Sequence, residues 1–266
     1  MGRGLGQLPP VYGGGLKTLT FEVELKGAGA AGTAPEFDAL LEACGLKGTN
    51  VASTSETYAP DNGGGTSCTI YYFEAAAAGS SQVRHILTGC RGTFSLSAEA
   101  GGIPVLSFTM TGHSAVPTTQ NLPSPTFDST VPVTMKNLTV TVNSVKGAVQ
   151  SFSLDLGNSV ITPADMNAAD GYGEVTIAER APSFQLTRHN ELIATISPWG
   201  DLVAGTARAI TTGDVGTAGN IWSFSAPKAT YVDVSPGEVD GIRQSVSRFM
   251  LGPNSTTSDE LSLQFK

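Results

Sequence analysis

Residues 18–49 read TLTFEVELKGAGAAGTAPEFDALLEACGLKGT, and two local patterns in this stretch decide the fold. Along 18–26, apolar and polar residues alternate. The apolar residues are Leu19, Phe21, Val23 and Leu25, and the polar residues are Thr20, Glu22, Glu24 and Lys26. Because successive side chains of a strand point to opposite faces, the pattern predicts a strand in a sheet with one buried and one solvated face.

The second pattern predicts a short helix over 33–44. Thr33 and Glu36 have the T-x-x-E spacing of a capping box, and Pro35 fits the first turn. Gly45 fits the position after the last turn. Four apolar residues recur at i, i+3, i+4 and i+7, which places them on one stripe: Phe37, Leu40, Leu41 and Cys44. A helix of about ten residues is marginal alone, so we expect this stripe to dock on a sheet.

Alternating segments recur on both sides of a proline-rich stretch, 116–132. They include 68–74, 93–98 and 105–111 before it, and 138–143, 151–156, 173–179, 221–226, 229–234, 243–251 and 260–266 after it. Ser197 and Pro198 begin a second short helical pattern, in which Trp199, Leu202 and Val203 repeat the spacing of the first. This order predicts two related β domains, 18–115 and 133–266, joined by the linker 116–132. A single domain with long decorations is the alternative.

Two segments are expected to lie outside these domains. Residues 1–17 are rich in Gly and Pro and predict an extended N-terminal arm, with a frayed terminus as the alternative. Residues 48–67 form a long polar stretch with three successive glycines and predict a protruding loop, because loops above ~12–15 residues are often functional or disordered. The candidates for contact with a neighbouring copy are Leu8 and Tyr12 in the arm and Tyr58, Asp61 and Asn62 in the loop.

The composition narrows the class of protein. Charged residues make up 14% of the chain, compared with roughly 25% in an average soluble domain. Such a surface fits a protein that buries its exterior against copies of itself, and it fits an extracellular β-sandwich equally well. The net charge is −8 and Lys and Arg form no cluster, so a surface that grips nucleic acid is not expected.

The three cysteines indicate where the protein is made. Cys44, Cys68 and Cys90 give an odd count with no C-x-x-C pair, which predicts reduced, buried thiols and synthesis in the cytoplasm. No stretch approaches ~18 consecutive apolar residues, and residues 1–17 lack the apolar run of a signal peptide. We therefore expect no association with a membrane.

No motif in the sequence predicts catalysis. His85, His113 and His189 lie far apart, without a second ligand at metal spacing. Residues 165–174 contain acids and glycines but not the spacing of a calcium loop. Glu22 and Glu24 share one strand face, as paired catalytic acids could, but no other feature indicates a glycan cleft. We expect no catalytic, cofactor or metal residues and no enzymatic activity.

The stretch 18–49 resembles the major tail proteins, or tail-tube proteins, of long-tailed bacteriophages. The resemblance continues through SCTIYYFE (67–74), ILTGCRGTFSLSAEAGGIPVLSFTMTG (86–112), SFSLDLGN (151–158) and NAADGYGEVTI (167–177). One difference is that the part before the first strand is short compared with relatives. The resemblance implies tail-tube-type β-sandwich or barrel domains, each with a docked short helix.

The same resemblance implies a structural virion protein. Its copies would stack as rings into a hollow tail tube, through which phage DNA leaves the capsid without specific binding. Two tandem domains would make trimeric rings with pseudo-sixfold symmetry, and single domains would make hexameric rings. The other implied partners are the tail terminator, tape-measure and distal tail proteins. The polar face of Thr20, Glu22 and Glu24 is the candidate lining of the lumen.

The main alternative is a carbohydrate-binding or adhesin-type β-sandwich. Such a protein would expose aromatic side chains along a groove. Aromatic residues make up only 7% of this chain, and Trp199 and Trp222 both lie in apolar segments that predict burial.

Overall fold

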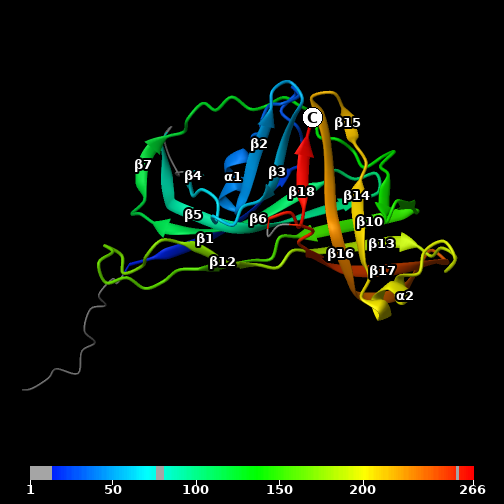
Figure 1. Ribbon diagram of the computed structural model, residues 1–266. Coiled ribbons are helices and arrows are strands. Elements are labelled where there is room, and N and C mark those ends of the chain that lie inside the picture. Colours follow the sequence, from blue (N-terminus) through cyan, green and yellow to red (C-terminus); the bar gives the residue numbers. More distant parts are fainter. Residues whose placement is uncertain (1–13, 76–80, 256–257) are drawn as a thin grey trace, which may run out of the picture.

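The computed structural model describes residues 14–75, 81–255 and 258–266. The chain is mainly β, with 55% of its residues in strands and 5% in helices, which confirms the predicted fold class. Its strands form two layers that enclose the core (Figure 1).

Seven antiparallel strands make the lower layer in Figure 1, termed here the lower sheet. In spatial order they are β1 (Leu16–Glu24), β6 (Val105–Ser114), β5 (Ser81–Glu99), β10 (Val149–Asp155), β13 (Ser183–His189), β17 (Ile242–Gly252) and β16 (Asn220–Val239). The predicted strands at 18–26, 93–98, 105–111, 151–156 and 243–251 all lie in this sheet. Because each of these segments alternates in polarity, each one contributes one face to the core and one to solvent.

The upper layer is built from shorter strands. They are β2 (Leu46–Val51), β3 (Ser55–Pro60), β18 (Ser262–Phe265), the first part of β16, β14 (Ala207–Thr212), β8 (Val140–Val142) and β9 (Val145–Lys146). β16 belongs to both layers, because residues 222–225 pair with β18 and residues 228–239 pair with β17. The remaining strands are β4 (Cys68–Ala75), β7 (Thr118–Asn121), β15 (Val215–Thr217) and the separate pair β11 (Asn158–Ile161) and β12 (Thr176–Arg180).

Aromatic side chains fill the space between the layers. The rings of Phe184 on β13 and Phe224 on β16 stack with centroids 5.2 Å apart. Phe265 on β18 makes edge contacts with Phe37, at 5.7 Å, and with Tyr58, at 5.9 Å. These contacts join the lower sheet, the upper strands and the residue before the first helix into one core.

Helix α1 (Asp38–Ala43) is shorter than the sequence predicts. Its N-cap is Phe37 and no side chain caps it, so the prediction that Thr33 and Glu36 form a capping box is wrong. Glu36 instead pairs with Lys26, 3.3 Å away, because it lies outside the helix. The predicted apolar stripe is nevertheless in the core. Helix α2 (Pro198–Ala204) begins after Ser197, as predicted, with Pro at its start.

Residues 48–67 are not one long loop, contrary to the prediction. β2 and β3 form a hairpin within this stretch, and β3 continues into the sheet by pairing with β18. The proline-rich stretch 116–132 also contains a strand, because β7 pairs with the first residues of β5. Both segments are polar in composition, but their backbones complete sheets that are built from distant parts of the chain.

The two halves of the chain share a pairing pattern. In the first half, β5 pairs with β4 and β7 through its N-terminal part and with β6 through its C-terminal part, and β6 pairs with β1. In the second half, β16 pairs with β14 and β18 through its N-terminal part and with β17 through its C-terminal part, and β17 pairs with β13. α1 lies between β1 and β4 in the sequence, and α2 lies between β13 and β14.

Two connections join these halves. β10 lies between β5 and β13 in the lower sheet, and β18 lies between β3 and β16 in the upper layer. The shared pattern supports a duplication, while the boundaries 18–115 and 133–266 stay a prediction.

Candidate assembly surfaces

The solvent side of the lower sheet is covered with hydroxyl groups. The strand registers align Thr20 with Thr109 and Thr109 with Thr93, so side chains of one kind form rows across strands. The surface termed here the hydroxyl face comprises Thr18, Thr20, Thr93, Ser95, Ser97, Ser107, Thr109, Thr111, Ser151, Ser153, Ser183 and Thr187. The hydroxyls of Thr18 and Thr111 lie 3.0 Å apart. The same face also carries exposed charged side chains, among them Glu22, Glu24, Glu99, Asp155 and Arg248.

The predicted lumen residues Thr20, Glu22 and Glu24 lie on the hydroxyl face. All three are exposed, and the alternation predicted for β1 is confirmed by its burial pattern. On β17 and β13, Arg248 donates a hydrogen bond from Nε to Gln185 Oε1 at 3.1 Å, so its charge is held along the sheet surface.

The lower sheet has two open ends, and they are unlike. Among the described residues, β1 pairs with β6 on one edge and has no strand on the other. At the opposite end, residues 231–239 of β16 pair with β17 on one edge, and no described strand lies on the other. The corresponding edge of β5 is occupied by β10. The six antiparallel pairings from β1 to β16 also mean that these two strands run in the same direction.

The predicted assembly residues do not form one site. Leu8 and Tyr12 lie outside the described residues. Tyr58 is 0% exposed, and its hydroxyl donates a hydrogen bond to Asp38 Oδ1 at 2.6 Å. Burial and this bond to a carboxylate raise the pKa of Tyr58. Tyr58 is thus a core residue, and its position gives no support to the prediction that it contacts a neighbouring copy.

Asp61 and Asn62 follow β3 at the surface. Arg180 Nη2 donates to Asn62 Oδ1 at 3.4 Å and to Glu260 Oε1 at 3.2 Å. Asp61 and Asn62 line the same hollow of about 270 Å³ as Arg180 and Glu260. These residues therefore border β12 and the chain near β18 rather than the tip of a free loop.

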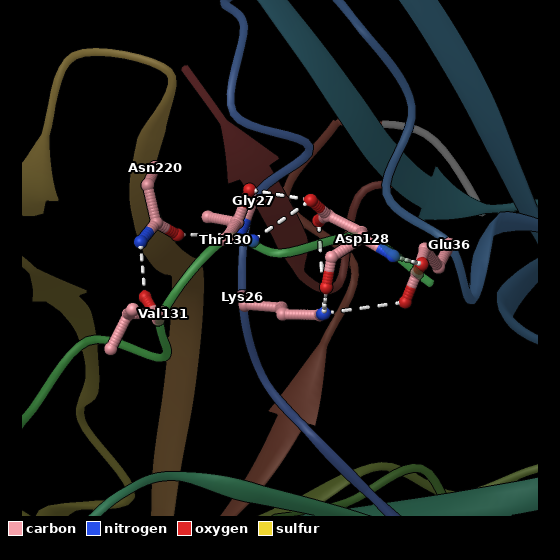
Figure 2. Close-up of polar contacts among 7 residues, drawn as sticks. All are labelled: Lys26, Gly27, Glu36, Asp128, Thr130, Val131 and Asn220. Carbon is pink, nitrogen blue, oxygen red and sulfur yellow. Dashed lines mark hydrogen bonds and ion pairs between the residues drawn. The ribbon is translucent and has the colours of Figure 1, made fainter. Parts of the chain in front are cut away.

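A strap, residues 122–135, crosses from the first half of the chain to the second. The carboxylate of Glu36 accepts a hydrogen bond from the Asp128 N–H, and Lys26 Nζ donates to the Asp128 carbonyl at 2.9 Å (Figure 2). The N–H and hydroxyl of Thr130 donate to Asp128 Oδ1 at 2.9 and 2.7 Å. These hydrogen bonds lower the pKa of Asp128, with a further contribution from Lys26.

The strap also contacts the second half. Asn220, at the start of β16, donates from Nδ2 to the carbonyl of Val131 at 2.7 Å, and its Oδ1 accepts from the Gly27 N–H at 2.7 Å (Figure 2). One amide thus binds both the strap and the segment after β1. Phe127 is 80% exposed although Glu36 and Lys26 hold the backbone of the next residue, so the strap presents apolar surface to solvent.

A second group of exposed apolar side chains, termed here the α2 patch, lies on α2 and in the segment before it and comprises Leu192, Ile193, Trp199 and Val203. Trp199 and Val203 are four residues apart on α2 and therefore share a helix face. Trp199 is 38% exposed, so the prediction that it is buried is wrong, whereas Trp222 is buried as predicted.

The titratable groups are arranged as structural pairs. His113 Nδ1 lies 2.6 Å from Asp170 Oδ2 and lowers the pKa of that carboxyl through this hydrogen bond. His85 Nε2 lies 3.3 Å from Glu74 Oε2. Within the described ranges, no group of three or more His, Cys, Asp or Glu side chains is placed to hold a metal ion. No helix in the same ranges is long and apolar enough to cross a membrane.

Residues 1–247 match the family described as phage tail tube protein. No curated protein matches the chain.

Proposed function

We propose that copies of this chain, which belongs to the phage tail tube protein family, join edge to edge into rings and that the rings stack into the tube of a phage tail. The chain is a structural protein of the virion tail. The observation that carries the proposal is the pair of unlike open ends of the lower sheet. An interface between unlike surfaces is head-to-tail, and it generates a closed ring when its rotation closes.

The direction of the strands specifies the joint further. β1 and β16 run the same way, so direct pairing between two copies would be parallel in an otherwise antiparallel sheet. Within the chain, β5 and β13 also run in the same direction, and β10 lies between them and pairs antiparallel with both. By analogy, we propose that one further extended segment lies between β16 of one copy and β1 of the next. The predicted arm, with Leu8 and Tyr12, is the candidate, because its residues 1–15 directly precede β1 and only its last two residues belong to that strand.

We propose that the hydroxyl face lines the lumen. Hydroxyl groups keep the surface wetted, and Glu22 and Glu24 repel phosphate groups at close range, so DNA can pass without being held. Three copies of seven strands, with one further segment at each of the three joints, give 24 strands, and barrels of roughly 16–18 strands already leave an aqueous channel. The opposite orientation would expose the hydroxyl face outside and leave the apolar strap facing DNA.

The shared pairing pattern of the two halves supports trimeric rings with pseudo-sixfold symmetry. Each copy would contribute two repeats, whereas a chain with one repeat would need hexameric rings. The exposed apolar side chains of the strap and the α2 patch are proposed to contact copies within or between rings. At its two ends the tube would meet the terminator and distal tail proteins, and the tape-measure protein would lie inside during assembly.

Negative-stain microscopy tests the assembly directly. Purified protein at high concentration is expected to form rings or tubes whose cross-section shows three copies and six repeats. Persistence as a monomer under all conditions would contradict the proposal. Six copies in one ring would contradict the trimeric form but not the proposal that the rings stack into a tube.

Engineered cysteines test the joint. Thr20→Cys on β1 and Ser235→Cys on β16, combined in a Cys68→Ser background, should become linked between copies by a thiol reagent that spans two strand spacings, roughly 10 Å. Each single substitution is the control and should give no linked ladder. Linkage of the double variant within a monomer, or no linkage in assembled tubes, would exclude these edges.

A further inference from the structure

The first half of the chain contains three thiols close to one another. Cys68 begins β4 and lies directly opposite Cys90 in the register of β4 with β5. Cys44 follows α1, and its Sγ donates to Met110 Sδ at 3.8 Å. All three cysteines are free. None of the proposed assembly surfaces includes these cysteines.

The backbone holds Cys68 and Cys90 at the spacing that a disulfide requires. Directly opposed residues of an antiparallel pair have Cα atoms roughly 4.5–5.5 Å apart, and disulfides join Cα atoms about 4.4–6.8 Å apart. Both side chains of such a pair project from the same face of the sheet. The bond could therefore form without movement of either strand.

The sulfur of Cys90 has a prepared position. Cys90 Sγ donates to the Leu87 carbonyl at 3.4 Å, across the irregular register of β5. A Cβ atom on Gly112 of β6 would lie 2.5 Å from this sulfur. Only glycine at position 112 leaves room for the Cys90 sulfur, which is thus fixed between β4 and β6.

The three thiols differ in reactivity. The neighbouring thiol of Cys90 lowers the pKa of the Cys68 thiol, which is only partly buried. Burial raises the pKa of Cys44, which is 0% exposed. Because the thiolate is the reactive form, Cys68 is the group that attacks, Cys90 is the group that completes the bond, and Cys44 stays inert.

We propose that Cys68 and Cys90 are a modification site that closes to an intrachain disulfide under oxidising conditions. With a diazene such as diamide, the Cys68 thiolate adds to one nitrogen of the N=N bond and the other nitrogen takes up a proton. The Cys90 sulfur then attacks Cys68 Sγ, breaks its S–N bond and loses its own proton. The two thiols give one S–S bond, and the diazene gains two electrons and two protons to become a hydrazine.

The bond would secure an edge of the fold. In the described part of the chain, β4 pairs with β5 alone, and Cys68 is its first residue. A disulfide at this point ties the start of β4 to the middle of β5. A tail made in the reducing cytoplasm and later released into oxidising surroundings would acquire this bond after assembly; that timing rests on the proposed function, and the bond itself does not.

The test is thiol counting and peptide mapping of the purified full chain after diamide treatment. The number of thiols titrated in denaturant should fall from three to one, and the mapped bond should join Cys68 to Cys90. The melting temperature should rise by roughly 5 °C or more, because the bond restrains the unfolded chain, and dithiothreitol should reverse the rise.

Matched single variants separate this site from other thiol chemistry. Cys68→Ser changes a partly exposed residue and should abolish both the bond and the rise in melting temperature. Cys44→Ser should leave the loss of two thiols unchanged. A bond that includes Cys44, a bond between two chains, or three free thiols after treatment would each overturn the proposal. Because the assay needs no tube, a chain that fails to assemble but forms the bond would contradict only the proposed function.

Discussion

β18 offers the sharpest test of how the two halves hold together. It lies between β3 of the first half and β16 of the second (Figure 1). Phe265 on this strand is almost fully buried. Phe265→Ala removes the ring that contacts Phe37 and Tyr58 and leaves a cavity in the shared core. Truncations of this kind typically cost about 3–5 kcal/mol. Against a total stability of about 5–15 kcal/mol, this loss is large.

Chemical denaturation with two probes measures the effect. Trp222 fluorescence reports on the second half, and labelling of the buried Cys44 and Cys90 thiols reports on the first. With a urea dependence of about 3 kcal/mol/M, a loss of 4 kcal/mol lowers the midpoint by about 1.3 M. Both probes should shift together, because the lost contacts belong to both halves.

Phe127→Ala is the matched control, since it removes the same ring from an exposed position on the strap. It should change the free energy of unfolding by no more than about 0.5 kcal/mol. A loss below 1 kcal/mol in Phe265→Ala, or a shift in only one probe, would refute the conclusion that β18 joins the halves into one cooperative unit.

Three further changes should have separable effects. Val203→Asp places a charge on the α2 patch and should raise the concentration needed for assembly at least several-fold, with the melting temperature of the monomer unchanged; normal assembly would remove the patch as a contact. Lys26→Met should speed proteolysis within the strap at a stability cost of about 1 kcal/mol or less. An unchanged rate of proteolysis would mean that the contact with Asn220 is enough to hold the strap in place. The pKa of Asp170 is depressed by His113, so its stabilising contribution is present at neutral pH and is lost as the pH falls through that lowered value. Cleavage within 165–173 should therefore accelerate below about pH 4. The Asp170→Asn variant should be cleaved at pH 7 as fast as the unaltered chain is cleaved below about pH 4.

Local pattern predicted the elements whose burial is decided within a few residues. The alternation at 18–26 identified β1, its solvated residues and hence part of the hydroxyl face. The stripe from Phe37 to Cys44 identified the docked side of α1, although the helix begins later than its capping box suggested. In both cases the period of the apolar residues carried the information, and it does not depend on distant contacts.

The remaining features depend on partners far along the chain. Tyr58 lies in a polar stretch, but pairing of β3 with β18 carries it into the core, across a separation of about two hundred residues. Glu36 had the spacing of a capping residue, but Lys26 and the strap hold it outside the helix. Trp199 lies in an apolar segment, yet α2 leaves it partly uncovered. No local period encodes such long-range pairings, so the sequence alone could not specify them.

A simple comparison of magnitudes indicates what the proposed ring needs besides its edges. β1 has nine residues, so its open edge can make roughly eight to ten backbone hydrogen bonds, each worth about 1 kcal/mol net. Association costs about 4–15 kcal/mol in lost freedom, and copies that each carry a charge of −8 also repel. The free energy gained from edge pairing alone therefore roughly equals the cost of association. A tandem chain helps because half of the junctions in a trimeric ring lie within chains, as β5, β10 and β13 do, and incur no association cost. For the junctions between chains, burial of exposed apolar side chains such as those of the strap and the α2 patch can supply the remaining free energy.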